Sequence, residues 1–235
     1  MKSVVVGSGG REHALAHVLG RDSDVTVTPG NPGIPNSTTQ SPLNIDADLF
    51  VIGPEAPLVD GLADQLRAQG KTVFGPGVDG AQLEGSKAWM KDLLVEANVP
   101  TAKHGTFTNE DEAIAFLSDM PLPYVIKTDG LAAGKGVIVT ESVNEAKDAI
   151  KNYLSGDAFG DAGKTVVIEE GLIGNEISIL AICDGTKAVP LAPAQDYKRL
   201  LNNDEGPNTG GMGAFSPIPS VSEDFVTQIM EEEIG

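Results

Sequence analysis

The sequence predicts an α/β protein in which a parallel-sheet domain is followed by a smaller α+β lobe. Two observations carry this expectation. Short apolar runs alternate with helical patterns over the first hundred residues, and a glycine-rich segment separates two β-branched runs further along. The 235 residues are enough for one large domain or two smaller domains, and in either case for a substantial core.

Composition argues against several classes of partner. The formal net charge of −18 disfavours a surface for nucleic acid or for an anionic membrane, because either would need a basic face. Cys183 is the only cysteine, so we expect neither a disulfide framework nor a cysteine-based metal site. No apolar run approaches the roughly 20 residues that cross a bilayer. We therefore expect a soluble cytoplasmic protein without a nucleic-acid or membrane partner.

The first hundred residues have the pattern of βαβ units. Apolar, β-branched runs predict parallel strands at residues 4–6, 25–27, 49–52 and 72–74. Apolar residues at helical spacing predict helices at residues 12–19 and 58–66. This alternation is typical of a Rossmann-like sheet, in which ligands bind beyond the carboxyl ends of the strands.

Three polar or glycine-rich segments follow these strands and together predict one pocket. They are residues 7–13, 29–33 and 53–55. Gly9 and Gly10 at a helix N-terminus would hold a phosphate through exposed N–H groups, and a simple tight turn is the alternative. Glu12 stands where the third glycine of a dinucleotide fingerprint belongs, so NAD and FAD are not expected. Glu55 would accept hydrogen bonds from sugar hydroxyls or an amine, or else cap a helix.

Between the sheet domain and the second lobe the pattern becomes helical. A helix over residues 86–97 places Trp89 in the core, and Asn109 with Glu112 forms a cap for the next helix. Lys87 lies at a helix start, where a lysine opposes the helix dipole. A bound anion would justify Lys87 there, and a solvated surface lysine is the alternative. We treat residues 101–120 as a linker region.

Residues 123–140 predict a hairpin whose loop is rich in glycine. The strands are residues 124–127 and 137–140, and small side chains between them let backbone N–H groups approach an anion. Lys127 and Lys135 add the point charges that attract phosphates. A standard P-loop is excluded, because Val137 follows Lys135 and Gly136. The segment is interpreted as a lid over nucleotide phosphates, with an ordinary glycine-rich turn as the alternative.

The remaining residues complete a small α+β lobe. A capping box at residues 142–145 opens a helix to about residue 154, and strands follow at residues 165–170, 176–183 and 187–191. Glu169 and Glu170 end the first of these strands and would line an adenine slot through backbone groups, with Glu176 placed to meet the ribose hydroxyls. Solvated acids are the alternative. Asp196 and Lys198 precede a second glycine-rich segment that would approach a substrate closely, unless it is a surface loop.

Four motifs, in order and spacing, identify a resemblance across essentially all of the chain. They are Gly-Ser-Gly-Gly-Arg-Glu-His at 7–13, Gly-Pro-Glu-Ala-Pro-Leu at 53–58, Ile-Lys-Thr-Asp-Gly-Leu-Ala-Ala-Gly-Lys-Gly-Val at 126–137, and Gly-Pro-Asn-Thr-Gly-Gly-Met-Gly-Ala at 206–214. The chain resembles the phosphoribosylamine–glycine ligase family of the ATP-grasp superfamily. The resemblance implies a Rossmann-like domain at 1–100, then an incomplete ATP-grasp domain with a mobile lobe at 121–190 and the start of a second lobe at 191–235.

The resemblance also implies an activity and its residues. Family members join glycine to 5-phosphoribosylamine in purine synthesis, using ATP with Mg²⁺ or Mn²⁺, and release glycinamide ribonucleotide, ADP and phosphate. The ATP residues are then Lys87, Lys127, Lys135, Glu169, Glu170, Leu172 and Glu176. Lys127, Lys135, Asp196 and Lys198 are implied to be catalytic. The residues implied to bind the other substrates are Gly9, Gly10, Asn31, Glu55, Asn208, Thr209 and Gly210.

The sequence departs from the family in its length. It ends at Gly235, whereas family members run on through an Arg-Phe-Gly-Asp-Pro-Glu type motif whose side chains hold Mg²⁺. We therefore expect a truncated version or one half of a split ligase completed by a C-terminal partner chain, with the metal ligands unknown. Two alternatives remain: a non-catalytic protein that binds nucleotide or ribose phosphate, and an ATP-grasp ligase for another amine.

Overall fold

A computed structural model of the chain describes residues 1–131, 136–156 and 163–231. The chain divides into two compact units, Met1–Met90 and Lys91–Gly235. Lys135 lies outside the described residues, as does the side chain of Asn208. Accordingly, the structure says nothing of the side chain of either predicted site residue.

A four-stranded parallel sheet forms the centre of the first unit, in the order β2-β1-β3-β4. Val5 of the central strand lies opposite Val27 on one side and Val51 on the other. The four predicted strands and the parallel sheet are thus confirmed. The strands are β1 (Lys2–Gly7), β2 (Asp24–Pro29), β3 (Leu49–Ile52) and β4 (Thr72–Phe74).

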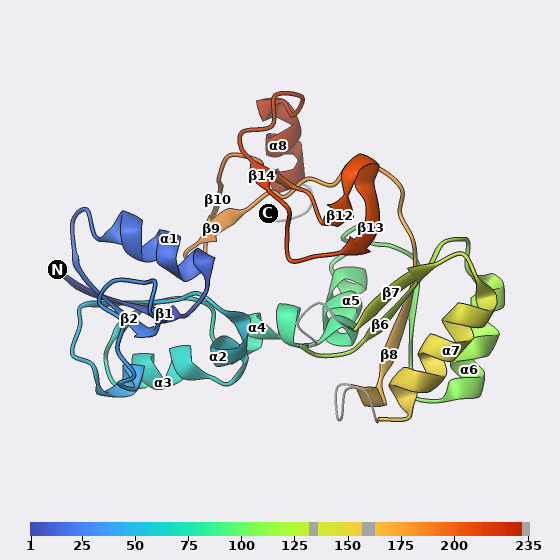
Figure 1. Cartoon of the computed structure of the whole chain (residues 1–235), viewed down its shortest axis with the longest axis horizontal. Coiled ribbons are helices and arrows are strands. Elements are labelled where there is room, and N and C mark those ends of the chain that lie inside the picture. The colour runs from blue at the N-terminus through green and yellow to red at the C-terminus, as the bar shows by residue number, and fades with distance from the viewer. Residues whose placement is uncertain (132–135, 157–162, 232–235) are drawn as a thin grey trace. The chain divides into compact units, whose positions relative to one another are not determined.

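Helices cover both faces of this sheet. Figure 1 shows α1 on one side and α3 on the other. Leu15 and Leu19 of α1 pack on the face that carries Val5, while Leu58 and Leu66 pack on the opposite face. This alternation follows from the strand period of two, which sends successive side chains to opposite faces. The helices are α1 (Gly10–Leu19), α2 (Glu55–Val59), α3 (Leu62–Ala68) and α4 (Val78–Gly85).

The prediction of a single helix over residues 58–66 was wrong, because the structure has two helices there, α2 and α3. Gly61 lies between them with a φ of +82°, a left-handed conformation that side chains other than glycine rarely adopt. A Cβ on Gly61 would also lie 3.1 Å from Val78 Cγ2. The glycine therefore ends one helix and allows the next to start in a new direction.

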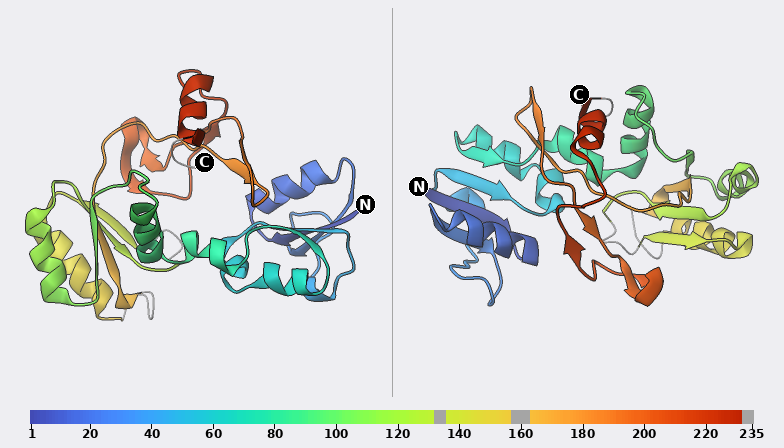
Figure 2. Two further views of the ribbon diagram at one scale, coloured as in Figure 1. Left: turned by 180° about the vertical axis from the view of Figure 1, so that it is seen from behind. Right: turned by 90° about the horizontal axis from the view of Figure 1, so that it is seen from above.

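The second unit contains a four-stranded sheet in the order β5-β8-β6-β7, with every neighbouring pair antiparallel. Ile126 and Ile168 are fully buried on the face that packs against α6 and α7. Figure 2 shows these two helices side by side against the sheet. The hairpin of β6 and β7 confirms the predicted strands around the glycine loop. The elements are β5 (His104–Phe107), α6 (Glu110–Phe116), β6 (Tyr124–Thr128), β7 (Val137–Thr140), α7 (Val143–Leu154) and β8 (Val166–Glu170).

Asn109 and Ser142 cap their helices as predicted, but the reciprocal bond of the capping box expected at residues 142–145 is absent, because the Glu145 side chain accepts from Thr140 Oγ1 instead. The Asn109 side chain accepts from the Glu112 amide at 3.1 Å, and Ser142 Oγ accepts from the Glu145 amide at 3.3 Å. The prediction that Trp89 lies in the core was wrong, since this side chain on α5 (Lys87–Glu96) is 37% exposed. The residue that α5 buries is Lys91 instead.

The last described stretch, residues 171–231, has strands but almost no core. Its elements pair into three separate two-stranded sheets, and of its described side chains only Ile218 is buried. The strand expected over 176–183 begins only at Ala181, because Ser178 makes no more than an isolated bridge to Ala194. The elements are β9 (Ala181–Cys183), β10 (Ala188–Pro190), β11 (Gln195–Asp196), β12 (Arg199–Leu201), β13 (Glu205–Asn208), β14 (Ala214–Phe215) and α8 (Glu223–Ile229).

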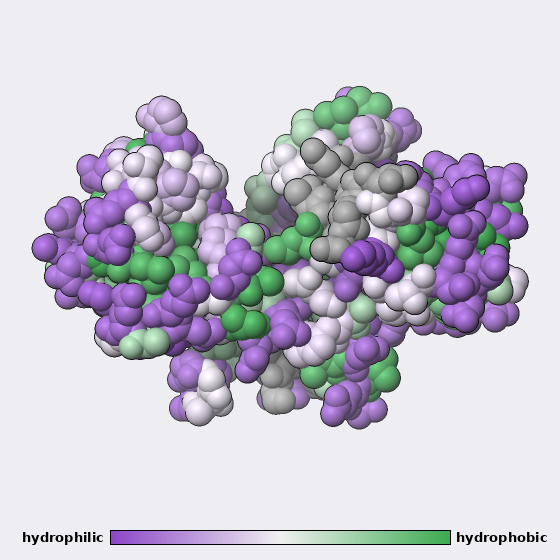
Figure 3. Space-filling model, turned by 90° about the horizontal axis from the view of Figure 1, so that it is seen from below, coloured by the Kyte–Doolittle hydropathy of each residue, from purple (hydrophilic) through white to green (hydrophobic). Residues whose placement is uncertain are grey.

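Hydrophobic side chains also reach the surface in other parts of the chain. On the face drawn in Figure 3, hydrophilic side chains cover much of the surface and hydrophobic ones gather in separate patches. Within the described ranges, no helix is both long enough and apolar enough to cross a membrane.

The core of the second unit yields a first prediction. Ile150 of α7 is fully buried against the sheet, so Ile150→Ala should lower the free energy of unfolding of this unit by about 3 kcal/mol. Val143 begins the same helix but is exposed, and Val143→Ala should change the free energy by no more than about 0.5 kcal/mol. Urea denaturation of both variants measures the difference, and equal losses would contradict this packing.

Candidate functional site

In the first unit, the structure brings together the three segments that follow β1, β2 and β3. The amide of Gly30 donates to Gly7 O at 3.0 Å, and the amide of Gly53 donates to Val6 O at 3.0 Å. Asn31 Nδ2 donates to Ser8 O at 2.7 Å. These bonds fix the three segments around the carboxyl ends of the strands, where ligands of such sheets bind.

Glu12 is the buried centre of this arrangement. Its side chain is 3% exposed, and Oε2 accepts from the Gly9 amide at 2.7 Å. Its atoms fill the space between two strand ends: a Cβ on Gly7 would lie 2.3 Å from Glu12 Cγ, and a Cβ on Gly53 would lie 2.2 Å from Oε1. The two glycines therefore make room for the carboxylate. Sequence reasoning used Glu12 only to exclude a dinucleotide and missed this role.

Arg11 connects the buried carboxylate to the exposed one. Its Nε lies 3.0 Å from Glu12 Oε1, and its Nη1 lies 2.9 Å from Glu55 Oε1. The hydrogen bond from Arg11 lowers the pKa of the Glu55 carboxyl, and the same bond raises the pKa of the Arg11 guanidinium. Both groups are therefore charged at neutral pH. Sequence reasoning also passed over Arg11, although it stands inside the first motif.

The N-terminus of α1 is open beside these charges. No heavy atom lies within 4 Å of the position that a Cβ on Gly10 would take. Exposed amides at a helix N-terminus and a nearby guanidinium suit an anion such as a phosphate, while the Glu55 carboxylate suits an amine or hydroxyl. Both polar atoms of the Asn31 side chain are already bonded within the protein, because Nδ2 donates to Ser8 O and Oδ1 accepts from the Gly33 amide at 2.7 Å.

The space around Glu12 yields a second prediction. Gly53→Ala should destabilise the first unit by about 2 kcal/mol or more, because its methyl group would overlap the buried carboxylate. Gly10→Ala is the matched control and should be close to neutral, since its methyl group would enter open space. Thermal denaturation compares the two. Adding Glu12→Ala to the Gly53→Ala variant should remove most of the clash, and a double variant that shows no such coupling would refute the overlap.

In the second unit, one buried carboxylate binds two lysines. Lys127 Nζ lies 2.9 Å from Glu169 Oε1, and Lys91 Nζ lies 3.1 Å from Oε2. Glu169 is 5% exposed and Lys91 is 4% exposed. The pairing register causes the first contact: Glu169 lies opposite Val125, so Lys127 is its diagonal neighbour on the same face. This face is the one turned away from α6 and α7.

The charges of this cluster favour an anion. Burial raises the pKa of Glu169, but the bonds and charges of Lys127 and Lys91 outweigh burial and lower it. The carboxylate is therefore ionised, and two ammonium groups share a single negative charge. Apart from the ion pair with Lys127, Glu169 Oε1 has no hydrogen-bonding partner among the described residues. The cluster thus has one surplus positive charge.

The cluster predicts a dependence of stability on pH. Because the folded-state pKa of Glu169 is lowered, its ionisation stabilises the fold above the ordinary glutamate value of about 4.3. That contribution is lost as the pH falls through the lowered value. Glu169→Gln should therefore cost about 3 kcal/mol at pH 7 and progressively less below pH 4 or so.

Urea denaturation between pH 3 and pH 7 measures this effect. The exposed Glu96 of α5 supplies the matched control, since Glu96→Gln should change little at any of these pH values. A destabilisation by Glu169→Gln that stays constant across the whole range would contradict the lowered pKa.

A third group of predicted residues meets around Lys198. Its Nζ lies 2.8 Å from Glu176 Oε2 and 3.0 Å from Asp196 Oδ1. The hydrogen bond to Glu176 raises the pKa of Lys198, with a further contribution from Asp196. The amide of Thr209 donates to Lys198 O at 2.6 Å, and Thr209 Oγ1 donates to the same oxygen at 3.0 Å. Two carboxylates and one ammonium thus lie beside the second glycine-rich segment.

The other predicted residues are not part of these clusters. Glu170 ends β8 and accepts from the Lys103 amide at 2.8 Å. Leu172 is 74% exposed, and Gly210 has open space where a Cβ would lie. Lys87 is the first residue of α5 and belongs to the first unit. Asn208 lies in β13, where only its backbone is described.

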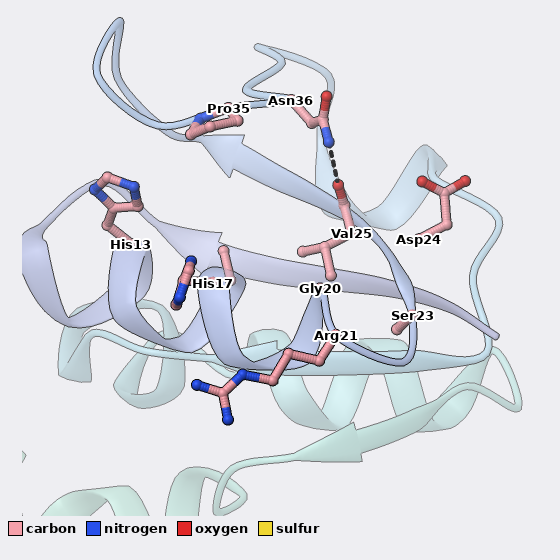
Figure 4. Close-up of a pocket in the computed structure, with 10 residues that line it drawn as sticks. His13, His17, Gly20, Arg21, Ser23, Asp24, Val25, Pro35 and Asn36 are labelled. Atoms are coloured by element: carbon pink, nitrogen blue, oxygen red, sulfur yellow. Dashed lines mark hydrogen bonds between the residues drawn. The ribbon is translucent and has the colours of Figure 1, made fainter.

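A cavity in the first unit lies away from the predicted site. It has a volume of about 500 Å³, and Figure 4 shows His13, His17 and Arg21 of the α1 region among its lining residues, with Asn36 bonded to Val25 O. None of the predicted binding residues lines it.

In the part of the chain that the structure describes, no three histidine, cysteine or acidic side chains gather closely enough to hold a metal ion.

Comparison with known sequences places both units in one family. The model described as phosphoribosylglycinamide synthetase, N domain, matches residues 1–84, and that of the ATP-grasp (A) domain matches residues 85–234. The chain belongs to the phosphoribosylglycinamide synthetase family. A curated relative, the phosphoribosylamine–glycine ligase of Xylella fastidiosa, is 48% identical over 253 residues, and its counterpart in Escherichia coli O157:H7 is 47% identical over 252 residues.

Solved structures agree with this family. The phosphoribosylamine–glycine ligase of Thermotoga maritima matches with a TM-score of 0.84 and 33% identity, over 98% of this chain and 59% of its own. D-alanyl-alanine synthetase A of Vibrio cholerae matches with a TM-score of 0.69 at 15% identity, covering 98% of this chain and 79% of its own, which shows the shared fold alone. The match to the Xylella relative covers all of this chain but only 58% of that ligase. The chain therefore spans a little over half the length of these family members.

Proposed function

We propose that this chain takes part in the ATP-dependent ligation of glycine to 5-phosphoribosylamine, which yields glycinamide ribonucleotide, ADP and phosphate. The observation that carries the proposal is the similarity along the whole chain to relatives named phosphoribosylamine–glycine ligase. The two charged sites fit the reaction, because it requires one anionic nucleotide and one phosphorylated amine.

The nucleotide belongs to the second unit in this proposal. Lys127 contacts the phosphates of ATP, for which the surplus charge around Glu169 is suited. The family resemblance alone adds Lys87 and Lys135 to the phosphate contacts. Glu169 lines the adenine slot through its backbone groups, and Glu176 suits the ribose hydroxyls. Glu170 and Leu172 follow on the same segment and line the adenine slot.

Phosphoribosylamine belongs to the first unit. Its phosphate lies at Gly9 and Gly10, where the helix N-terminus is open and Arg11 adds a guanidinium. Glu55 accepts from the amine or a sugar hydroxyl, and Asn31 holds the neighbouring loop in place. Glycine reacts beside Asp196, Lys198 and the segment of residues 208–210.

The chemistry proceeds in two steps. One carboxylate oxygen of glycine attacks the γ-phosphorus of ATP, forming glycyl phosphate as the bond to ADP breaks. The amine of phosphoribosylamine then attacks the glycyl carbonyl carbon, loses a proton and displaces phosphate, which leaves the amide. Lysine ammonium groups stabilise the charge of the transferred phosphoryl group, and a closed loop would protect the acyl phosphate from water.

Family resemblance also implies Mg²⁺, or Mn²⁺ in its place. The described residues do not fit a metal site, since no group of three suitable side chains is present among them. The proposal therefore assigns the metal ion to no residue of this chain, and no step above depends on one.

We further propose that the active enzyme includes a polypeptide equivalent to the part of the relatives that this chain does not span. The support is the exposed apolar surface of residues 171–231, where Leu180, Ile182 and Val189 are about half exposed or more. Isolated two-stranded sheets are marginally stable in water, so this stretch needs further strands or a covering surface. A partner chain that supplies them would complete the site.

An ADP-release assay tests both proposals. The pure chain is mixed with ATP, Mg²⁺, glycine and freshly generated 5-phosphoribosylamine, with and without a polypeptide that matches the remainder of the Xylella fastidiosa ligase. We expect turnover only when the second polypeptide is present. Turnover with another amine but not with phosphoribosylamine would overturn the assigned substrate. Nucleotide binding without turnover in both mixtures would instead indicate a non-catalytic binding protein.

A further inference from the structure

Lys91 has a position that stability alone does not explain. Its ammonium group is buried, donates to Thr101 Oγ1 at 2.7 Å and lies 3.1 Å from Glu169 Oε2. Removing an ammonium group from water carries a large desolvation cost, and replacing a buried ion pair with apolar side chains often leaves stability unchanged or improves it. Apolar side chains in place of the whole ion pair would avoid that cost. The charge of Lys91 therefore calls for another reason.

Lys91 affects the net charge around Lys127, because both lysines pair with the same carboxylate. Among the described residues, three titratable groups face Glu169: Lys91 from α5, Lys127 from β6 and His104, which lies directly opposite on β5. Without Lys91, the carboxylate would neutralise Lys127 alone, and the pair would carry no net charge. With Lys91, the same carboxylate serves two ammonium groups and the cluster keeps one positive charge. A surplus charge with little solvent around it attracts an anion more strongly than one in water.

We propose that Lys91 is a positioning residue for nucleotide phosphates. It holds Glu169 Oε2 and offsets the charge of the carboxylate, so that Lys127 is fixed in direction by Oε1 yet remains attractive to an anion. Lys91 itself touches no ligand, because it is buried beneath Glu169 and Thr101. The inference rests on the proposed function only in naming the anion as the phosphates of a nucleotide.

A positioning role and a purely structural role differ in which ligands they affect. If Lys91 supplies charge, its loss lowers the affinity for phosphorylated ligands in proportion to their phosphate charge. The affinity for an uncharged nucleoside then stays almost the same. If Lys91 only supports the fold, ADP and adenosine lose affinity together. The comparison of these two ligands therefore separates the roles in one protein.

The test uses Lys91→Met in the full chain, with binding of ADP and adenosine measured by isothermal titration calorimetry. We expect ADP to bind about tenfold more weakly and adenosine to change by less than about twofold. Lys91→Arg should recover most of the ADP affinity. Lys147→Met, at an exposed position on α7, is the matched control and should leave both affinities unchanged. Equal losses for both ligands, or an unchanged ADP affinity, would overturn the proposal.

A second measurement keeps the proposal testable if the chain binds no nucleotide. In that case the proposed function fails, but the pKa of the Glu169 carboxyl can still be followed by carbon NMR. Lys91→Met should raise that pKa, because one of the two ammonium groups that lower it is gone. An unchanged pKa would show that Lys91 does not act on Glu169. If Lys91→Met does not fold, Lys91→Gln removes the charge and keeps a polar group for Thr101.

Discussion

The cost of burying a carboxylate governs both units of this protein. An ionised carboxylate removed from water must find donors or cations, and two glutamates here solve the problem in different ways. Glu12 uses the Gly9 amide and the Arg11 guanidinium, and Glu169 uses the ammonium groups of Lys91 and Lys127. In each unit, the amide or cationic groups gathered around the carboxylate are of kinds that also suit an anion. The contacts that satisfy each carboxylate therefore also hold in place the groups that we propose to bind ligands.

The stretch of residues 171–231 differs from the rest of the chain in how it is held together. In each unit a four-stranded sheet packs its buried side chains against helices. The later stretch has strands, turns and ion pairs around Lys198 but only Ile218 buried among its described side chains. Its local geometry is thus set by hydrogen bonds, while the hydrophobic contribution that normally holds such strands is absent within the described chain.

Sequence reasoning succeeded where the signal is local and failed where it depends on distant neighbours. Apolar runs and caps such as Ser142 gave the strands and helix starts, because both depend on a few adjacent residues. The role of Glu12 was missed, since the space it fills is made by glycines at the ends of two different strands. Lys91 was missed for the same reason, as its partner Glu169 lies on a strand far along the chain. The break at Gly61 could have been read from the glycine itself.

The position of Glu169 has a consequence for the fidelity of folding. Strand side chains alternate between faces, so a slip of β8 by one residue against β6 would turn this carboxylate toward α6 and α7. There it would enter an apolar core without Lys91 or Lys127, at a cost that no neighbouring residue offsets. Misregistered forms of the sheet are therefore disfavoured from the moment the strands meet. The ion cluster that we propose to bind a nucleotide therefore also specifies the register of the strands that carry it.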